Sequence, residues 1–197
     1  GFTELERVEI PDSVTSIGKF AFSGCLSLID MTLPNSITSI GEGAFERCIQ
    51  LSSIFLPNSL TYIGDDVFIG CENIQYINIP NGITEISDTA FGGCKGLSDI
   101  IIPDAVVSID NYAFVDCNGA SYVTIGSGLT SIGDRAFYGC TRLKKLTIYA
   151  TTPPSLGRGT FLDAGDFIIY VPSGSVETYK NDSYWGGFGD RIQAISN

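Results

Sequence analysis

Cysteine is the residue type whose spacing in this sequence most invites a chemical role. Six cysteines occur, each 23 residues after the one before: Cys25, Cys48, Cys71, Cys94, Cys117 and Cys140. In an exported protein, an even number of cysteines suggests a disulfide framework. Thiolates also bind metal ions such as zinc, and free cysteine packs in protein cores as a small hydrophobic side chain. The spacing must be explained before one of these three roles can be assigned.

Acidic side chains form a second column with the same period. Its members are Glu42, Asp65, Asp88 and Asp134, with Lys19 and Asn111 at the same position of other repeats. They precede an Ala-Phe pair, where a carboxylate favours the N-terminus of a helical turn. A calcium ladder is the alternative, because calcium prefers oxygen ligands. The column lacks the spacing of a known calcium-binding loop, so the structural interpretation is preferred and the calcium alternative stays open.

Motifs for enzymatic chemistry are absent from the sequence. The chain contains no histidine, which excludes Ser-His-Asp and Cys-His catalysis and histidine metal sites. No G-x-S-x-G segment occurs, and "GGFGDR" at 186–191 lacks both the third glycine and the preceding strand of a dinucleotide-binding motif. No spacing singles out a catalytic pair of carboxylates. The sequence predicts a protein that is not an enzyme, with no cofactor and no metal site.

The cysteines belong to a repeat of 23 residues that extends over most of the chain. Phenylalanine precedes each cysteine by three residues, at Phe22, Phe45, Phe68, Phe91, Phe114 and Phe137. Paired apolar residues recur upstream, at Val8/Ile10, Met31/Leu33, Ile54/Leu56, Ile77/Ile79, Ile100/Ile102, Val123/Ile125 and Leu146/Ile148. Proline follows five of these pairs, at Pro11, Pro34, Pro57, Pro80 and Pro103. The unit is L-x-x-I-x-I-P-x-x-V-T-x-I-G-x-x-A-F-x-x-C.

Each part of this unit predicts an element of one coil. The alternation in I-x-I indicates a short strand with one buried face, and proline ends it because proline cannot donate to a strand ladder. The glycine after V-x-x-I fits a tight corner, and A-F-x-x-C places Phe and Cys on one face of a helical turn. Ordering a coil costs roughly 1–2 kcal/mol per residue, whereas burying about eight side chains returns only ~1.5–3 kcal/mol each. A single coil is therefore unstable, and stacked coils that share one core form a solenoid.

Solenoid geometry decides among the roles of the cysteines. Adjacent coils would place cysteine Cα atoms about 5 Å apart, within disulfide range. The side chains all point the same way into the core, and parallel Cβ vectors do not give the required torsion of about 90°. A linear row also cannot surround a metal ion. We therefore predict that the cysteines and phenylalanines are buried structural residues, with one or more disulfides as the alternative.

The repeat unit closely resembles the 23-residue repeat of the BspA-like leucine-rich repeat family of bacterial surface proteins, typical of host-associated anaerobic bacteria. The resemblance covers nearly the whole chain. It implies a right-handed leucine-rich β/α superhelix that is rich in strands, with one parallel sheet, short helical turns on the opposite side and a C-terminal cap. Adhesion to host or matrix proteins is the best-known role of the family, so the resemblance also implies an extracellular or cell-surface protein.

The two ends of the chain depart from the repeat. We expect leucine-rich repeat coils over residues 1–150, the first of them incomplete, and an irregular last coil with a cap over 151–197. Val171 and Pro172 return to the register of the repeat and predict an eighth strand. Ser173 is the expected N-cap of a short helix at 176–180, with Trp185 and Phe188 as apolar plugs. At the other end Phe2 occupies the cysteine column, so we expect further coils before it in the native protein, with another element that covers the open end as the alternative.

Composition restricts the class of partner. The 197 residues are 44% hydrophobic, which excludes a disordered chain. The net charge is −11, which argues against nucleic acid and against anionic membrane surfaces. The longest apolar runs, such as 167–171, are far too short to span a bilayer. No signal peptide is visible, so we expect the export signal of an exported protein to lie outside this sequence.

The exposed face of the predicted sheet is the candidate binding surface. Strand residues that flank the buried pair point outward, and four of these positions on successive coils are large and apolar: Phe55, Tyr76, Ile101 and Tyr122. At about 4.8 Å per coil they would form a strip about 15 Å long. Exposed aromatic residues on a rigid sheet are typical of recognition surfaces, although single exposed apolar residues are also ordinary.

The sequence thus predicts a non-enzymatic extracellular module that binds a host or matrix protein, or a glycan, on its strand face. The alternative is a stiff structural stalk that presents another domain of a larger surface protein. The sequence does not identify the partner or the oligomeric state.

Overall fold

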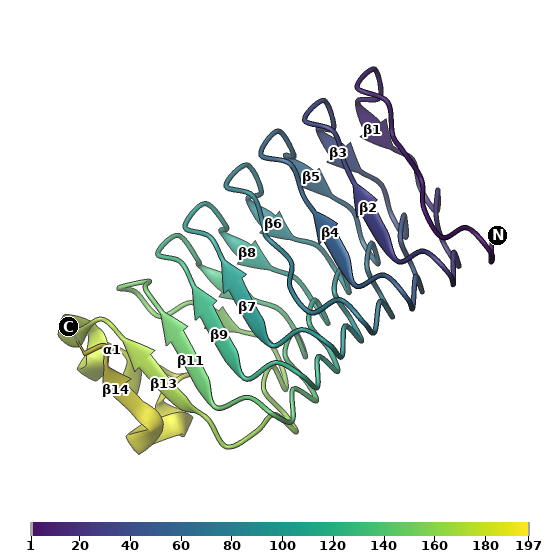
Figure 1. Ribbon diagram of the computed structural model, residues 1–197. Helices are drawn as coiled ribbons and strands as arrows, with labels where there is room; N and C mark the ends of the chain where they lie inside the picture. Colours follow the sequence, from purple (N-terminus) through teal and green to yellow (C-terminus); the bar gives the residue numbers. More distant parts are fainter. Residues whose placement is uncertain (1, 197) are drawn as a thin grey trace.

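The computed structural model describes residues 2–196 and consists of parallel coils stacked into an elongated solenoid with helices at its C-terminal end (Figure 1). Five of the seven I-x-I segments, together with segments 168–171 and 192–194, form the first row of strands. These are β2 (Asp30–Thr32), β4 (Ser53–Phe55), β7 (Asp99–Ile102), β9 (Tyr122–Ile125), β11 (Lys145–Ile148), β13 (Ile168–Val171) and β14 (Ile192–Ala194). All pairings in the row are parallel, with β2 beside β4 and with β7, β9, β11, β13 and β14 in succession. The predicted eighth strand at Val171 is confirmed as β13.

The V-T-x-I segments, expected to make a corner, form a second row of short parallel strands. These are β1 (Ser16–Ile17), β3 (Ser39–Ile40), β5 (Tyr62–Ile63), β6 (Glu85–Ile86), β8 (Ser108–Ile109), β10 (Ser131–Ile132) and β12 (Ser155–Leu156). This second row consists of two sheets, with strand orders β1-β3-β5 and β6-β8-β10-β12. The prediction of a single parallel sheet was therefore wrong, because the outward Ser and inward Ile of this segment alternate as in any half-buried strand.

The A-F-x-x-C segment forms consecutive turns and not the expected helical turn. In the third coil the Cys71 N–H donates to Phe68 O (3.0 Å) within the turn. Such turn bonds alternate with ladder bonds to the next coil, in which, for example, the Phe68 N–H donates to Ala90 O (2.8 Å). Two residues of the next coil have positive φ, Thr89 at 53° and Gly93 at 69°. Left-handed backbone cannot continue a helix, so the segment is a column of turns, which still keeps Phe and Cys on its buried side.

Phenylalanine rings stack along the core of the solenoid. From Phe22 to Phe161, ring centroids of successive coils are 5.1–5.5 Å apart and the planes differ by 4–11°. Phe161 then meets Phe167, Trp185 and Phe188 at large angles. The ladder of parallel rings therefore ends where the cap begins.

The cap consists of the 3-10 turn η1 (Ser173–Ser175), helix α1 (Val176–Lys180) and the kinked 3-10 segment η2 (Gly186–Arg191). The helix predicted at 176–180 is confirmed, but Ser173 is not its N-cap. The Ser175 N–H already donates to Pro172 O (2.8 Å), so helical geometry begins one turn earlier and Ser175 becomes the N-cap. Trp185 is fully buried as expected and Phe188 is half-buried against the core.

Candidate functional site

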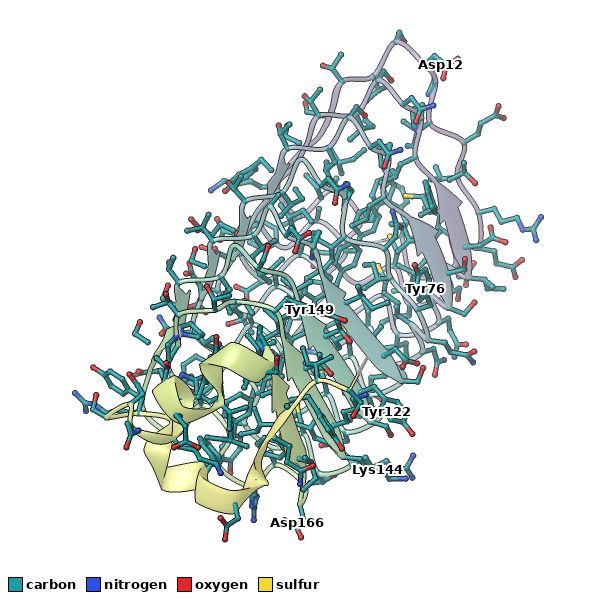
Figure 2. The ribbon with its side chains drawn as sticks, turned by 90° about the vertical axis from the view of Figure 1, so that its left-hand side faces the viewer. Asp12, Tyr76, Tyr122, Lys144, Tyr149 and Asp166 are labelled. Atoms are coloured by element: carbon teal, nitrogen blue, oxygen red, sulfur yellow. The ribbon has the colours of Figure 1, made fainter. Side chains whose placement is uncertain are left out.

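The four predicted binding residues are all exposed on the face of the solenoid that carries the first row of strands. The exposed fractions are 59% for Phe55, 58% for Tyr76, 52% for Ile101 and 49% for Tyr122. Figure 2 shows Tyr76 and Tyr122 on the side of the molecule that carries these strands. We call these four residues the apolar strip.

The register shows that the apolar strip follows a zigzag across the strands. Asp99 is paired with Tyr122, and Ile101 with Thr124. Tyr76 and Tyr122 occupy the first outward position of their coils, whereas Phe55 and Ile101 occupy the second. Polar side chains fill the alternate positions, so apolar and polar groups are interleaved over the face.

Asn78 interrupts the backbone ladder in the middle of the strip. No strand is assigned to its segment, and the first row is split between β4 and β7. The Asn78 Nδ2 donates to Leu56 O (2.7 Å), and the Leu56 N–H donates to Asn78 Oδ1 (3.0 Å). The side-chain amide thus takes the place of a peptide group and links this coil to the coil of β4.

A groove with a volume of about 430 Å³ lies beyond the C-terminal end of the strip. Its walls include Tyr122 of the strip together with Tyr149 and Tyr170, and the chain segment after β14 closes one side. Thr147 lies in the groove and is only 7% exposed. The Lys145 ammonium lies 4.8 Å from the centroid of the Tyr170 ring, in cation–π contact. We call this the tyrosine groove.

Sequence analysis did not identify Tyr149 and Tyr170 as candidate site residues. The signal for Tyr149 was present, because it stands in the proline column of the repeat. Its N–H donates to Ile125 O (2.9 Å), a bond that proline could not make. The backbone hydrogen bonding to the preceding coil therefore continues one residue beyond β11, and the Tyr149 ring, 47% exposed, lines the groove.

The cysteines are free thiols inside the core. Five of them donate from Sγ to the carbonyl of the phenylalanine in the preceding coil. These bonds are Cys48 to Phe22, Cys71 to Phe45, Cys94 to Phe68, Cys117 to Phe91 and Cys140 to Phe114, at 3.0–3.3 Å. Burial raises the pKa of Cys94 and of Cys140 to about 12. Neutral buried thiols such as these two are poor nucleophiles and poor metal ligands, which favours the predicted packing role of the column.

Three side chains of this column, Lys19, Asn111 and Asp134, bond to the next coil. Lys19 forms an ion pair with Glu42 (2.7 Å). The Asp134 N–H donates to Asn111 Oδ1 (2.9 Å), and the Arg158 N–H donates to Asp134 Oδ1 (2.7 Å). The expected role at a helix N-terminus was wrong, because the following segment is not a helix. Within residues 2–196, no group of three His, Cys, Asp or Glu side chains could hold a metal ion.

The fold and its surface define a class: a strand-rich leucine-rich-repeat solenoid whose side chains are ordered in columns. The family model described as BspA type Leucine rich repeat region matches residues 1–121 and 84–185. The chain belongs to this family, as its repeat indicated. Within the described residues, no helix is both long and apolar enough to cross a membrane.

Two crystal structures illustrate the similarity. The leucine-rich repeat protein of T. pallidum aligns with a TM-score of 0.79 and 28% identity, over 91% of this chain and 84% of that one. A leucine-rich repeat protein from Bacteroides ovatus aligns with a TM-score of 0.67 and 26% identity, over 98% of this chain and 55% of that one. A comparison with curated proteins finds no significant match.

Proposed function

We propose that this protein is an exported, non-enzymatic binding module that holds an extracellular protein or glycan on its strand face. The observation that carries the proposal is the apolar strip, in which four large side chains are each about half exposed on successive coils. Single exposed apolar residues are common, but a row of them on one face is typical of an interaction surface.

The scaffold under the strip supports this proposal. The strip residues flank positions that are almost fully buried, such as Ile54, Ile77, Ile100 and Val123. Stacked rings and parallel pairing hold the coils below them in a fixed spacing. A surface that is ordered before binding loses little conformational entropy on association, so a modest contact area can give useful affinity.

A structural stalk is the second candidate function. The unbroken phenylalanine ladder favours it, because a continuous core makes the solenoid stiff along its length. A stalk needs no partner on its strand face, so a direct binding experiment separates the two functions.

The double variant Phe55→Ser with Tyr122→Ser tests the binding function. Partners are first recovered with the wild-type chain from host extracellular proteins and from a glycan array. We expect the double variant to lose this binding, with nearly unchanged thermal unfolding, because both side chains are already exposed. Tyr62→Ser is the matched control, since Tyr62 is 56% exposed on the second row of strands. Unaltered affinity of the double variant contradicts the proposal.

A further inference from the structure

The positive charge of the protein is concentrated in one segment, which includes the coil of β11 beside the tyrosine groove. Residues 135–162 contain five of the eleven basic residues and none of the 22 acidic ones. The chain as a whole has a net charge of −11, whereas this segment is positively charged. Three of the five basic residues, Arg142, Lys144 and Lys145, lie within four positions at the start of β11, and all three are exposed.

These three cations are free to bind a ligand. None of them takes part in the four ion pairs found among residues 2–196. Asp166 on the following coil is paired with Arg191 (2.8 Å) and so is already neutralised. Lys145 is flanked in the register by Tyr122 and Ile168, neither of them acidic. Figure 2 shows Lys144 on the same side of the molecule as Tyr122.

We propose that the tyrosine groove and these three cations form a binding site for an acidic oligosaccharide, one that carries carboxylate or sulfate groups. This deepens the proposed function, because it assigns a ligand class to one end of the strand face. The groove offers the hydroxyl groups of Tyr122, Thr124 and Thr147, with those of Tyr149 and Tyr170. Hydroxyl groups can both donate and accept hydrogen bonds, as the hydroxyls of a sugar do, while tyrosine rings provide rigid apolar area for its C–H faces.

The basic residues select for negative charge on the sugar. Lys145 lines the groove and already contacts the Tyr170 ring, which orients its ammonium group. Ammonium or guanidinium groups that bond to carboxylate or sulfate form hydrogen bonds stronger than those between neutral groups. A neutral sugar would gain none of these bonds.

An acidic peptide fits the site less well than an acidic sugar. Strands β9, β11 and β13 are each paired on both sides, so the groove has no free strand edge to which a peptide could add. A long acidic chain would also extend toward the rest of the molecule, which holds all 22 acidic residues. A short oligosaccharide within a groove of about 430 Å³ contacts a lining that contains no acidic side chain.

Isothermal titration of the whole chain with four probes tests the proposal. The probes are two acidic sugars, a hyaluronan tetrasaccharide and a chondroitin sulfate tetrasaccharide, with the neutral sugar chitotetraose and the acidic peptide hexaglutamate. We expect hyaluronan to bind with a Kd below about 1 mM and to weaken as salt is raised. We expect chitotetraose to bind at least about tenfold more weakly, because it cannot pair with the cations. Equal binding of hexaglutamate, or no binding of hyaluronan and of a chondroitin sulfate tetrasaccharide, overturns the proposal.

Variants assign the binding to this site. We expect Lys145→Gln and Tyr149→Ala each to weaken hyaluronan binding about tenfold or more. The first variant loses a charged hydrogen bond to the sugar, and the second loses an aromatic ring that packs against it. Lys95→Gln is the matched control, since it removes the same charge from an exposed corner of another coil. Equal weakening by Lys95→Gln would show that only net charge matters and would overturn the site. Both test variants retain the apolar strip. If they leave hyaluronan binding unchanged, the acidic-sugar site is wrong, whereas the proposed function is still tested by the Phe55→Ser, Tyr122→Ser double variant.

Discussion

At the scale of single residues, the most regular feature is the cysteine at the end of each repeat unit, whose thiol bonds to the preceding coil. Each of five Sγ atoms reaches back to a phenylalanine carbonyl of the preceding coil, as in the 3.2 Å contact from Cys94 to Phe68. A serine would make a similar bond but would bring a more polar group into the core, and an alanine would leave the carbonyl with only the turn bond from the cysteine N–H of its own coil. Cysteine gives the carbonyl a second bond and fills the space with apolar volume.

Ionisation of the buried thiols predicts how stability depends on pH. Cys94 and Cys140 have folded pKa values of about 12, against 9.0 for an ordinary thiol, because of burial. Above pH 9 the unfolded chain releases these protons more readily than the folded chain does, so the free energy of unfolding falls as pH rises from about 9 to about 12. Chemical denaturation across this range is expected to show a smaller fall for the Cys94→Ala, Cys140→Ala double variant than for the wild type.

Alkylation gives an independent check on the same residues. Iodoacetamide should label the native thiols slowly at neutral pH and rapidly once the chain is unfolded. Identical pH slopes of the two proteins, or rapid labelling in the native state, would contradict the picture of buried neutral thiols.

At the scale of elements, the first row of strands has a junction in place of a continuous ladder. Between β4 and β7 the backbone is not paired as a strand, and the Asn78 amide bonds to both polar groups of Leu56. The junction lies within the apolar strip, between the coils of Phe55 and Ile101. The Asn78 side chain therefore links the coil of Tyr76 to the coil of Phe55 within the candidate binding face.

Replacing Asn78 tests the junction. Asn78→Ala removes both bonds to Leu56, which is fully buried as a residue, and we expect a loss of about 1–3 kcal/mol in the free energy of unfolding. Hydrogen exchange should accelerate at the Leu56 amide and its neighbours before it does elsewhere. Thr124→Ala is the control, because Thr124 occupies the equivalent position in β9, where the backbone is fully paired. Equal effects of the two variants would show that Asn78 has no special role.

At the scale of the whole molecule, the solenoid is a one-dimensional stack whose C-terminal end is covered by the cap. Trp185 is fully buried, and its Nε1 donates to Pro154 O (2.6 Å). The hydroxyl of Tyr179, also fully buried, donates to Ala150 O (2.9 Å). Both side chains thus attach the cap to the segment just after β11. Because each coil contacts mainly its neighbours, loss of the cap should act first on the last coils.

The variant Trp185→Ala tests this order. We expect the free energy of unfolding to fall by about 3–5 kcal/mol, as for other large-to-small changes in a core. Hydrogen exchange should rise most in β13 and β11, and progressively less toward β4. Trp185→Phe keeps an aromatic ring but loses the bond to Pro154. Its free energy of unfolding should therefore lie between those of Trp185→Ala and the wild type. Uniform acceleration along the chain would show that the solenoid unfolds as one unit and not from its end.

The sequence by itself determined the repeat architecture and most of the core. Every coil must bury the same face against its neighbours, so the columns of phenylalanine and cysteine could be identified from periodicity alone. The same logic located the exposed positions of the apolar strip, because strand residues alternate between the two faces. Periodicity could also place β13 and the helix at 176–180, where the register returns or a new pattern begins.

Only the tertiary structure decided how the columns bond between coils. Turns with left-handed residues replace the expected helix because neighbouring coils supply hydrogen bonds that a single repeat cannot reveal. The second row of strands arises in the same way, from pairing at a separation of 23 residues. The tyrosine groove needs Tyr122, Tyr149 and Tyr170 from three different coils together with the chain after β14. The repeat unit describes one coil. The groove, in contrast, is formed by residues from several coils, some of which, such as Tyr149, depart from the repeat.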